Sequence, residues 1–261
     1  MDHQLKVALI QSDLVWENPE ENRINFTNKI TGILEDVDLI VLPEMFTSGF
    51  TMNAKRVAEP MKGDTVKWMQ TIANQKHCAI MGSVVIREND AFFNRGLFVH
   101  PNGHIDHYDK HHTFTLAGEH QTYSAGKKQV IINYKDWKIC PLICYDLRFP
   151  VWARNTHDYE LLIYVANWPK TRVDAWDTLL RARAIENMSY CIGVNRVGFD
   201  GNNHEYVGHS AAYNVLGRQI DDLEKEQESI SIVSLDKSEL NDTREKLGFL
   251  KDRDVFTLEV E

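Results

Sequence analysis

Short, wholly apolar runs alternate with helix-like segments along nearly the whole of this 261-residue chain. The runs 39–42 and 161–166 have the length and composition of strands buried on both faces, and both are far shorter than the ~18 residues needed to span a bilayer. No linker rich in Pro, Gly and Ser and no solenoid-like repeat interrupts the alternation. The pattern predicts a single α/β domain over residues 1–261, with sheets between layers of helices.

The expected helices begin and end at recognisable signals. Asn18 and Pro19 suit a helix N-terminus, and an apolar face then extends to about residue 35 through Ile24, Ile30, Ile33 and Leu34. Three further helices are expected at 64–76, 174–188 and 238–247, and the helix at 174–188 is built on Trp176, Leu179, Leu180 and Ile185. The expected strands are 5–11, 38–44, 78–86, 92–100, 104–110, 129–134, 137–144 and 160–167, with further β-structure to residue 236.

Charge and composition exclude several classes of partner. The chain has 29 Lys and Arg against 38 Asp and Glu, a formal charge of −9. Binding to a nucleic acid or to a membrane surface needs clustered basic residues, so neither partner is expected. No basic leader followed by an apolar stretch is visible, and the four cysteines have no CxxC spacing. We therefore expect free thiols in a soluble cytoplasmic protein.

Three of the predicted strands end in a residue that can react. Glu44, Lys110 and Cys144 each follow an apolar or β-rich segment. The carboxyl ends of strands in α/β sheets are where ligands gather, so these side chains are placed to converge there. Each signal alone is weak, because a cysteine after an apolar run is more often inert core than nucleophile. The occurrence of all three residues at strand ends predicts a catalytic site.

The segments around these residues are long and distinctive. LPEMFTSGF contains Glu44, YDKHHTF contains Lys110 and CYDLRFP contains Cys144; 66 residues separate the first two and 34 the last two. These segments, with ANWP at 166–169 and RARAIEN at 181–187, resemble the motifs of the nitrilase superfamily of carbon–nitrogen hydrolases. They look most like those of the bacterial omega-amidases.

The resemblance implies a four-layer α-β-β-α sandwich, assembled as a homodimer or larger homo-oligomer. It also implies a cysteine-dependent amidase that hydrolyses the terminal amide of small 2-oxo acid omega-amides, such as 2-oxoglutaramate or 2-oxosuccinamate. The products would be the dicarboxylate and ammonia, formed through a thioester. Glu119 resembles the additional glutamate of the family, and we expect it to orient Lys110 and the substrate; a solvated loop acid is the alternative.

The roles of these residues can also be derived from elementary chemistry, independently of the resemblance to a family. A thiol with a pKa near 8.5 is mostly protonated at neutral pH, so Cys144 needs a base. Glu44, if shielded from water, suits that task and can later protonate the leaving ammonia. Lys110 can meet the oxyanion with a fixed positive charge, and the backbone N–H of Tyr145 is the natural second donor.

Other residues near the motifs have plainer interpretations. Trp168 and Phe50 could bind substrate in the pocket, but core packing is about as common for such residues. Asp146 and Arg148 are expected to brace the turn after Cys144. The histidines His104, His107, His111 and His112 lack a metal-ligand spacing, and no Gly-rich phosphate loop is present, so neither a metal nor a nucleotide cofactor is expected.

Several questions stay open at the level of the sequence. The same Glu–Lys–Cys machinery would also serve a nitrile, an N-carbamoyl compound or another small amide. A catalytically idle binding protein and a metal-dependent hydrolase are the remaining alternatives. An omega-amide of a 2-oxo acid needs a cation for its distal carboxylate, and Arg148, Arg154, Arg172 and Arg196 are the candidates. The apolar residues dispersed after about 248 predict a tail lying across a partner subunit or the rim of its own sheet.

Overall fold

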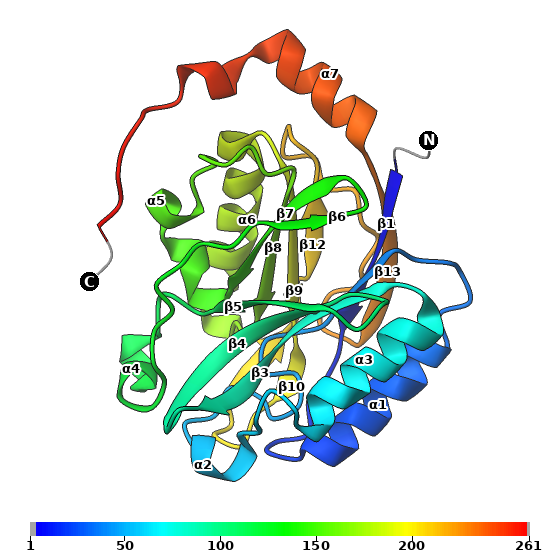
Figure 1. Ribbon diagram of the computed structural model, residues 1–261, viewed down its shortest axis with the longest axis vertical. Coiled ribbons are helices and arrows are strands. Elements are labelled where there is room, and N and C mark those ends of the chain that lie inside the picture. The colour runs from blue at the N-terminus through cyan, green and yellow to red at the C-terminus, as the bar shows by residue number, and fades with distance from the viewer. Residues whose placement is uncertain (1–3, 260–261) are drawn as a thin grey trace.

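The computed structural model describes residues 4–259, so the single domain predicted over 1–261 extends past the described residues at both ends. Two sheets pack face to face, and helices cover the outer face of each (Figure 1). This is the four-layer α-β-β-α sandwich that the resemblance implies. None of the helices within residues 4–259 has the length and apolar character to cross a membrane.

The first sheet has six strands in the order β13-β1-β2-β3-β4-β5. Strands β1, β2 and β3 are parallel, because helices α1 (Pro19–Thr31) and α3 (Asp64–Lys76) make the crossovers between them. Strands β3, β4 and β5 then form antiparallel hairpins. The strand bounds are β1 Gln4–Gln11, β2 Leu39–Val41, β3 Ala79–Glu88, β4 Ala91–Val99, β5 Ile105–Asp109 and β13 Ser229–Asp236.

The second sheet has five strands in the order β12-β9-β8-β7-β6. Strands β7, β8 and β9 are parallel, with helices α5 (Pro150–Ala153) and α6 (Val173–Asn187) in the connections. A separate two-stranded ribbon pairs β10 (Val197–Phe199) with β11 (Glu205–Val207). The remaining bounds are β6 Ile132–Tyr134, β7 Trp137–Ile143, β8 Leu161–Ala166, β9 Tyr190–Asn195 and β12 Ala211–Tyr213.

Short helices complete the chain. α2 (Ala54–Val57) and α4 (Glu119–Thr122) lie in loops beside the first sheet, and α7 (Lys237–Leu247) follows the last strand. Among residues 4–259 there are also four short 3₁₀-helices: η1 Thr115–Ala117, η2 Cys144–Arg148, η3 Lys170–Arg172 and η4 Phe249–Asp252.

The period-two alternation of β1 divides the core into layers. Leu5, Val7 and Leu9 belong to the cluster between the sheets, which also holds the buried residues of β7 and β8. Ala8 and Ile10 point to the other face, into the cluster that contains Phe26 of α1. Both faces of the strand are therefore buried, which explains why these strands read as continuous apolar runs.

The helices lie close to their predicted positions, but some of the residues predicted on their buried faces are exposed. α3 has the predicted bounds, but α1 ends at Thr31, and Ile24 and Leu34 are exposed rather than on its buried face. The α1 face is instead made by Phe26, Ile30 and a buried asparagine, Asn22. Asn22 is buried because its side-chain amide donates to the backbone carbonyls of residues 15, 18 and 47. In α6, Ile185 is likewise exposed.

Candidate active site

The carboxyl ends of β2, β5 and β7 meet at one edge of the sandwich and bring Glu44, Lys110 and Cys144 together. The ammonium of Lys110 donates to Glu44 Oε1 over 2.9 Å, although 66 residues separate the two in the chain. Glu44 and Lys110 are buried, and Cys144 lines the pocket above them. The convergence predicted from the strand ends is confirmed.

Glu119 is also part of this cluster. It begins α4, and its two carboxylate oxygens accept from Lys110 Nζ at 2.9 and 3.1 Å. Burial raises the pKa of Glu119, and the charge of Glu44 adds to the effect while Lys110 opposes it. The alternative that Glu119 is a solvated loop acid is wrong, because its side chain is fully buried.

Lys110 stays protonated despite its burial. Desolvation disfavours the ammonium, but the carboxylates of Glu119 and Glu44 outweigh it and hold the pKa of Lys110 above its ordinary value. Burial raises the pKa of the Cys144 thiol well above its ordinary value, and the charge of Glu44 raises it further. The site in its resting state therefore contains a fixed cation beside a thiol that keeps its proton.

Cys144 lies at a sharp turn at the end of β7. Its φ of +45° is in the left-handed region, which a residue with a Cβ adopts only when its surroundings hold it there. Asp146 supplies part of that hold, because its buried carboxylate accepts from the N–H of Ile143 at 3.0 Å. The same carboxylate accepts from Tyr108 and His112, which flank Lys110 in sequence. The expected bracing role of Asp146 is confirmed.

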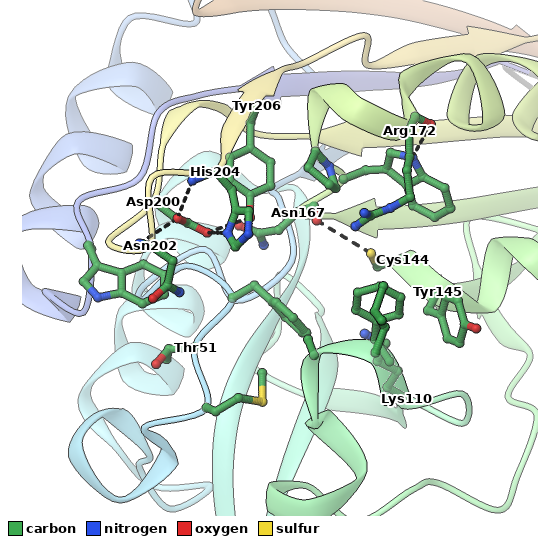
Figure 2. Close-up of a pocket in the computed structure, with 18 of the residues that line it drawn as sticks. Thr51, Lys110, Cys144, Tyr145, Asn167, Arg172, Asp200, Asn202, His204 and Tyr206 are labelled. Atoms are coloured by element: carbon green, nitrogen blue, oxygen red, sulfur yellow. Dashed lines mark hydrogen bonds and ion pairs between the residues drawn. The ribbon is translucent and has the colours of Figure 1, made fainter.

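A cavity of about 620 Å³ opens over Cys144. Phe50, Tyr145 and Trp168, the residues predicted to bind substrate, all line it. Figure 2 shows Lys110, Cys144, Tyr145 and Arg172 on one side of this pocket and Thr51, Asp200, Asn202 and His204 on the other. The pocket therefore exposes the thiol to a ligand while the carboxylates remain beneath it.

Two of the four candidate arginines reach the pocket. Arg148 stacks 4.8 Å above the Trp168 ring, and Arg172 lies 5.2 Å above the Phe114 ring. Within residues 4–259 neither guanidinium forms an ion pair with a carboxylate, so both are free to bind an anion. Of the two roles expected for Arg148, bracing the turn and binding a carboxylate, its place in the cavity wall over an aromatic ring favours the second.

The other two arginines serve the fold. Arg196 is completely buried and donates to Asp13 over 2.7 Å and to backbone carbonyls behind the pocket. Arg154 donates to the backbone carbonyl of Glu186 at the end of α6. Neither lines the cavity, so both are removed from the set of candidate carboxylate ligands.

Two asparagines in the site were not given a role by the sequence. Asn94, in β4, donates to Glu44 Oε1 at 2.8 Å and to Glu119 Oε1 at 3.3 Å. Asn167, after β8, donates its backbone N–H to Glu44 Oε2 at 2.8 Å, and its carbonyl lies 3.9 Å from Cys144 Sγ. The sequence signal for Asn94 was a polar residue within the largely apolar strand β4. The signal for Asn167 was its place in the ANWP segment after β8.

The histidines are hydrogen-bonded or exposed, as expected. His111 contacts the carbonyl of Gly126 and His112 the carboxylate of Asp146, whereas His107 is exposed. His104 lies with His100 and Asp106 at the β4–β5 turn, where their donor atoms are within 4.8 Å of one another. None of those three lines the pocket. All four cysteines are free thiols, as predicted.

The motifs, the sandwich and the clustered Glu, Lys and Cys together define a class of hydrolase. The family model of carbon-nitrogen hydrolases matches residues 6–245, and this chain belongs to that family. It is therefore an enzyme that hydrolyses carbon–nitrogen bonds, and its substrate is a small molecule.

Particular relatives narrow the comparison. The chain is 44% identical over 254 residues to Omega-amidase YafV of Escherichia coli (strain K12), an alignment that covers 97% of this chain and 98% of that protein. It is 32% identical to 2-oxoglutaramate amidase of Bacillus subtilis (strain 168), covering 94% and 96% of the two chains.

Solved structures agree with the fold. The chain superposes on XC1258 of Xanthomonas campestris, a CN-hydrolase superfamily protein with an arsenic adduct in its active site, with a TM-score of 0.96 and 40% identity over 98% of this chain and all of that one. It is similar to Nit3 of Saccharomyces cerevisiae, a member of branch 10 of the nitrilase superfamily, with a TM-score of 0.83, 25% identity and 94% of each chain covered.

Proposed function

We propose that this enzyme is an omega-amidase that hydrolyses the terminal amide of small 2-oxo acids, with 2-oxoglutaramate and 2-oxosuccinamate as the substrate class. The observation that carries the proposal is a pocket in which an accessible thiol, a buried ammonium and two buried carboxylates lie beside two guanidinium groups that form no ion pair within residues 4–259. The similarity to an omega-amidase and to a 2-oxoglutaramate amidase over nearly the full chain supports it.

The first half of the proposed reaction forms a thioester. The Cys144 sulfur attacks the amide carbonyl carbon while Glu44 takes the thiol proton. Lys110 and the N–H of Tyr145 stabilise the oxyanion that develops on the carbonyl oxygen. When the C–N bond breaks, Glu44 gives the proton to the leaving nitrogen, which departs as ammonia.

The second half of the proposed reaction is the hydrolysis of the thioester by water. Glu44 takes a proton from the water that attacks the thioester, and the C–S bond breaks to return the Cys144 thiol and release the dicarboxylate. Glu119 holds Lys110 in place throughout, through the two hydrogen bonds that its carboxylate accepts. No cofactor enters this scheme.

Arg148 and Arg172 give the pocket a preference for a substrate with a carboxylate. Guanidinium groups bind carboxylates through paired, charge-assisted hydrogen bonds. Both arginines lie on the walls of the cavity that contains Cys144, so a substrate can present its amide to the thiol and its carboxylate to an arginine. We assign the distal carboxylate of the substrate to this pair.

Ammonia release from 2-oxoglutaramate, glutamine and butyramide, measured side by side, tests the substrate class. Butyramide lacks the carboxylate, and glutamine places an ammonium where a neutral carbonyl is expected. Each should lose kcat/KM by ~10² or more relative to 2-oxoglutaramate, because polar groups of the pocket are left unpaired. Equal rates on all three amides would leave an amidase without the proposed specificity.

We also propose that the enzyme acts in the cytoplasm as a homodimer or larger homo-oligomer. The segment after α7 supports self-association, because Val255, Phe256 and Leu258 lie exposed on it. Figure 1 shows this segment running in extended form around the outside of the molecule toward α5. A second copy of the chain would cover these apolar side chains.

A further inference from the structure

Asn94 is a buried side chain at the centre of the catalytic cluster. Its amide nitrogen lies 2.8 Å from Glu44 Oε1 and 3.3 Å from Glu119 Oε1, so one side chain connects both carboxylates. Asn94 lines no part of the cavity and is 1% exposed. It therefore acts on the reaction through the two glutamates and not through contact with a substrate.

The surroundings of Asn94 fix which end of its amide faces the carboxylates. The backbone N–H of Met45 donates to Ser83 Oγ at 2.8 Å, which leaves the hydroxyl proton of Ser83 available for another acceptor. That proton goes to Asn94 Oδ1, 2.8 Å away. Since the amide oxygen is occupied by Ser83, the NH₂ group must point to Glu44 and Glu119. All hydrogen bonds in the series from Met45 through Ser83 and Asn94 to the two carboxylates therefore donate in the same direction.

The two oxygens of Glu44 consequently differ in their capacity to accept a proton. Oε1 accepts from both Lys110 and Asn94, which occupies its two lone pairs. From the part of the chain that the structure describes, Oε2 accepts one hydrogen bond, from the backbone N–H of Asn167, and the carbonyl of that same residue is in contact with Cys144 Sγ. Oε2 is thus the oxygen with a lone pair left to accept a proton.

We propose that Asn94 is a positioning residue that saturates Glu44 Oε1 and so directs the proton of Cys144 to Glu44 Oε2. Its second hydrogen bond, to Glu119, holds the two carboxylates side by side around Lys110. This inference rests on the role of Glu44 as the base in the proposed function. It does not depend on which amide is the substrate.

The pH dependence of alkylation at Cys144 tests the proposal without any amide. Because the thiol holds its proton tightly, its reaction with iodoacetamide near neutral pH requires Glu44 to be ionised and to take that proton. Cys78, Cys140 and Cys191 are fully buried, so peptide-level mass spectrometry can follow Cys144 selectively. Removing one hydrogen bond to a carboxylate favours its protonated form.

Asn94→Ala should move the acid limb of the Cys144 alkylation profile upward by about one pH unit, the size expected for one charge-assisted hydrogen bond. Asn94→Asp keeps the shape of the side chain but adds a third carboxylate, and it should move the limb further in the same direction. Ser83→Ala frees the amide to rotate and should give a smaller upward shift. In steady-state assays the loss should fall on kcat with little change in KM.

Asn155→Ala is the matched control, because Asn155 is an equally buried asparagine that donates to Tyr159 O and Asn187 O and does not line the pocket. It should lower thermal stability and leave the limb where the wild type has it. An unshifted limb in both Asn94 variants, or an equal shift in Asn155→Ala, would overturn the proposal. If instead Glu44→Gln alkylates as fast as wild type, Glu44 is not the base, and the proposed mechanism fails with it.

Discussion

At the scale of single residues, two buried carboxylates bind one buried ammonium in the site. Lys110 satisfies both glutamates at 2.9 Å, and its compact charge fits between them beneath the Phe50 ring, 5.1 Å from Nζ. A planar guanidinium has a different shape and a fixed fork of donors. The identity of this cation, and not only its charge, is therefore part of the mechanism.

Lys110→Arg should lower kcat by ~10² or more, a loss comparable to removing one oxyanion donor, because the broad guanidinium cannot keep both carboxylates and the oxyanion position in reach. Steady-state ammonia release measures the loss, and circular dichroism checks that the variant folds. Lys127→Arg, an exposed lysine later in the same connection, should change nothing. Full activity in Lys110→Arg would remove Lys110 from the reacting centre.

The activity should fall on the acid side from a pH above the range of an ordinary glutamate, ~4.3. Burial and Glu44 raise the pKa of Glu119, so Glu119 is ionised above that raised pKa and gains a proton as the pH falls through it. Protonated Glu119 no longer holds Lys110 by charge. A profile of kcat/KM against pH checks the limb, which belongs to the coupled carboxylates as a set. Full activity down to pH 4 would contradict this.

The reacting residues and two of their supports, Glu119 and Asp146, could be predicted from the sequence, whereas the supporting asparagines could not. Glu44, Lys110 and Cys144 can be recognised because each follows a predicted strand and lies in a long motif. Asn94 acts on groups 50 and 25 residues away in the chain, and no local pattern connects it to them. The choice among the four arginines likewise required the tertiary structure, because Arg196 is buried and paired with the exposed Asp13, away from the pocket arginines.

At the scale of elements, a single buried carboxylate joins the two loops that carry Lys110 and Cys144. Asp146 in η2 accepts from Ile143 at the end of β7, and from Tyr108 and His112 on either side of Lys110. Arg183 of α6 reaches the same turn and donates to the carbonyl of Leu147 at 2.6 Å. The geometry of the site therefore depends on connections between elements as well as on the strands.

Asp146→Ala should destabilise the fold by about 3 kcal/mol or more, because several buried donors lose a charged acceptor at once. Activity at a temperature where the variant is folded should fall as well, since the turn that holds Cys144 loosens. Urea denaturation followed by circular dichroism measures the stability. Asp136→Asn, in the exposed β6–β7 turn, should stay within ~0.5 kcal/mol of wild type. Equal stability of the two variants would contradict the bracing role.

The element bounds were more predictable than the buried faces of the helices. Apolar spacing gave α3 its predicted ends, and the strands appeared as apolar runs because both their faces are covered. The α1 face was mispredicted where a polar residue, Asn22, is buried to satisfy distant carbonyls. Spacing detects apolar side chains, but it does not reveal hydrogen-bond partners that only the tertiary fold supplies.

At the scale of the whole molecule, the segment after α7 is held at a few points and otherwise exposed. Arg253 donates to Asp158 at 2.6 Å and to the carbonyl of Asn155 at 3.0 Å, which ties the segment to the end of its own second sheet. Leu258 lies against a small cavity beside Trp152, whereas Val255 is fully exposed. The prediction that the segment contacts a partner subunit stays a prediction.

Deleting residues 248–261 should lower the mass of the assembly, because the exposed apolar side chains on this segment would be covered by a second copy. Size-exclusion chromatography with light scattering measures the mass. Arg253→Ala is the informative partner variant, since it frees the segment from its own chain without removing its apolar residues. An unchanged mass and unchanged activity after the deletion would show that the segment serves neither assembly nor catalysis.

Covalent capture of the substrate tests the central claim most directly. Enzyme quenched with acid during turnover of 2-oxoglutaramate and digested for peptide mass spectrometry should carry the acyl group on Cys144. Cys144→Ala should fold, carry no acyl group and release no ammonia, while Cys140→Ala, which alters a buried thiol in the strand that precedes Cys144, should keep much of its activity. Ammonia release by Cys144→Ala at the wild-type rate, or an acyl group on another residue, would contradict the account.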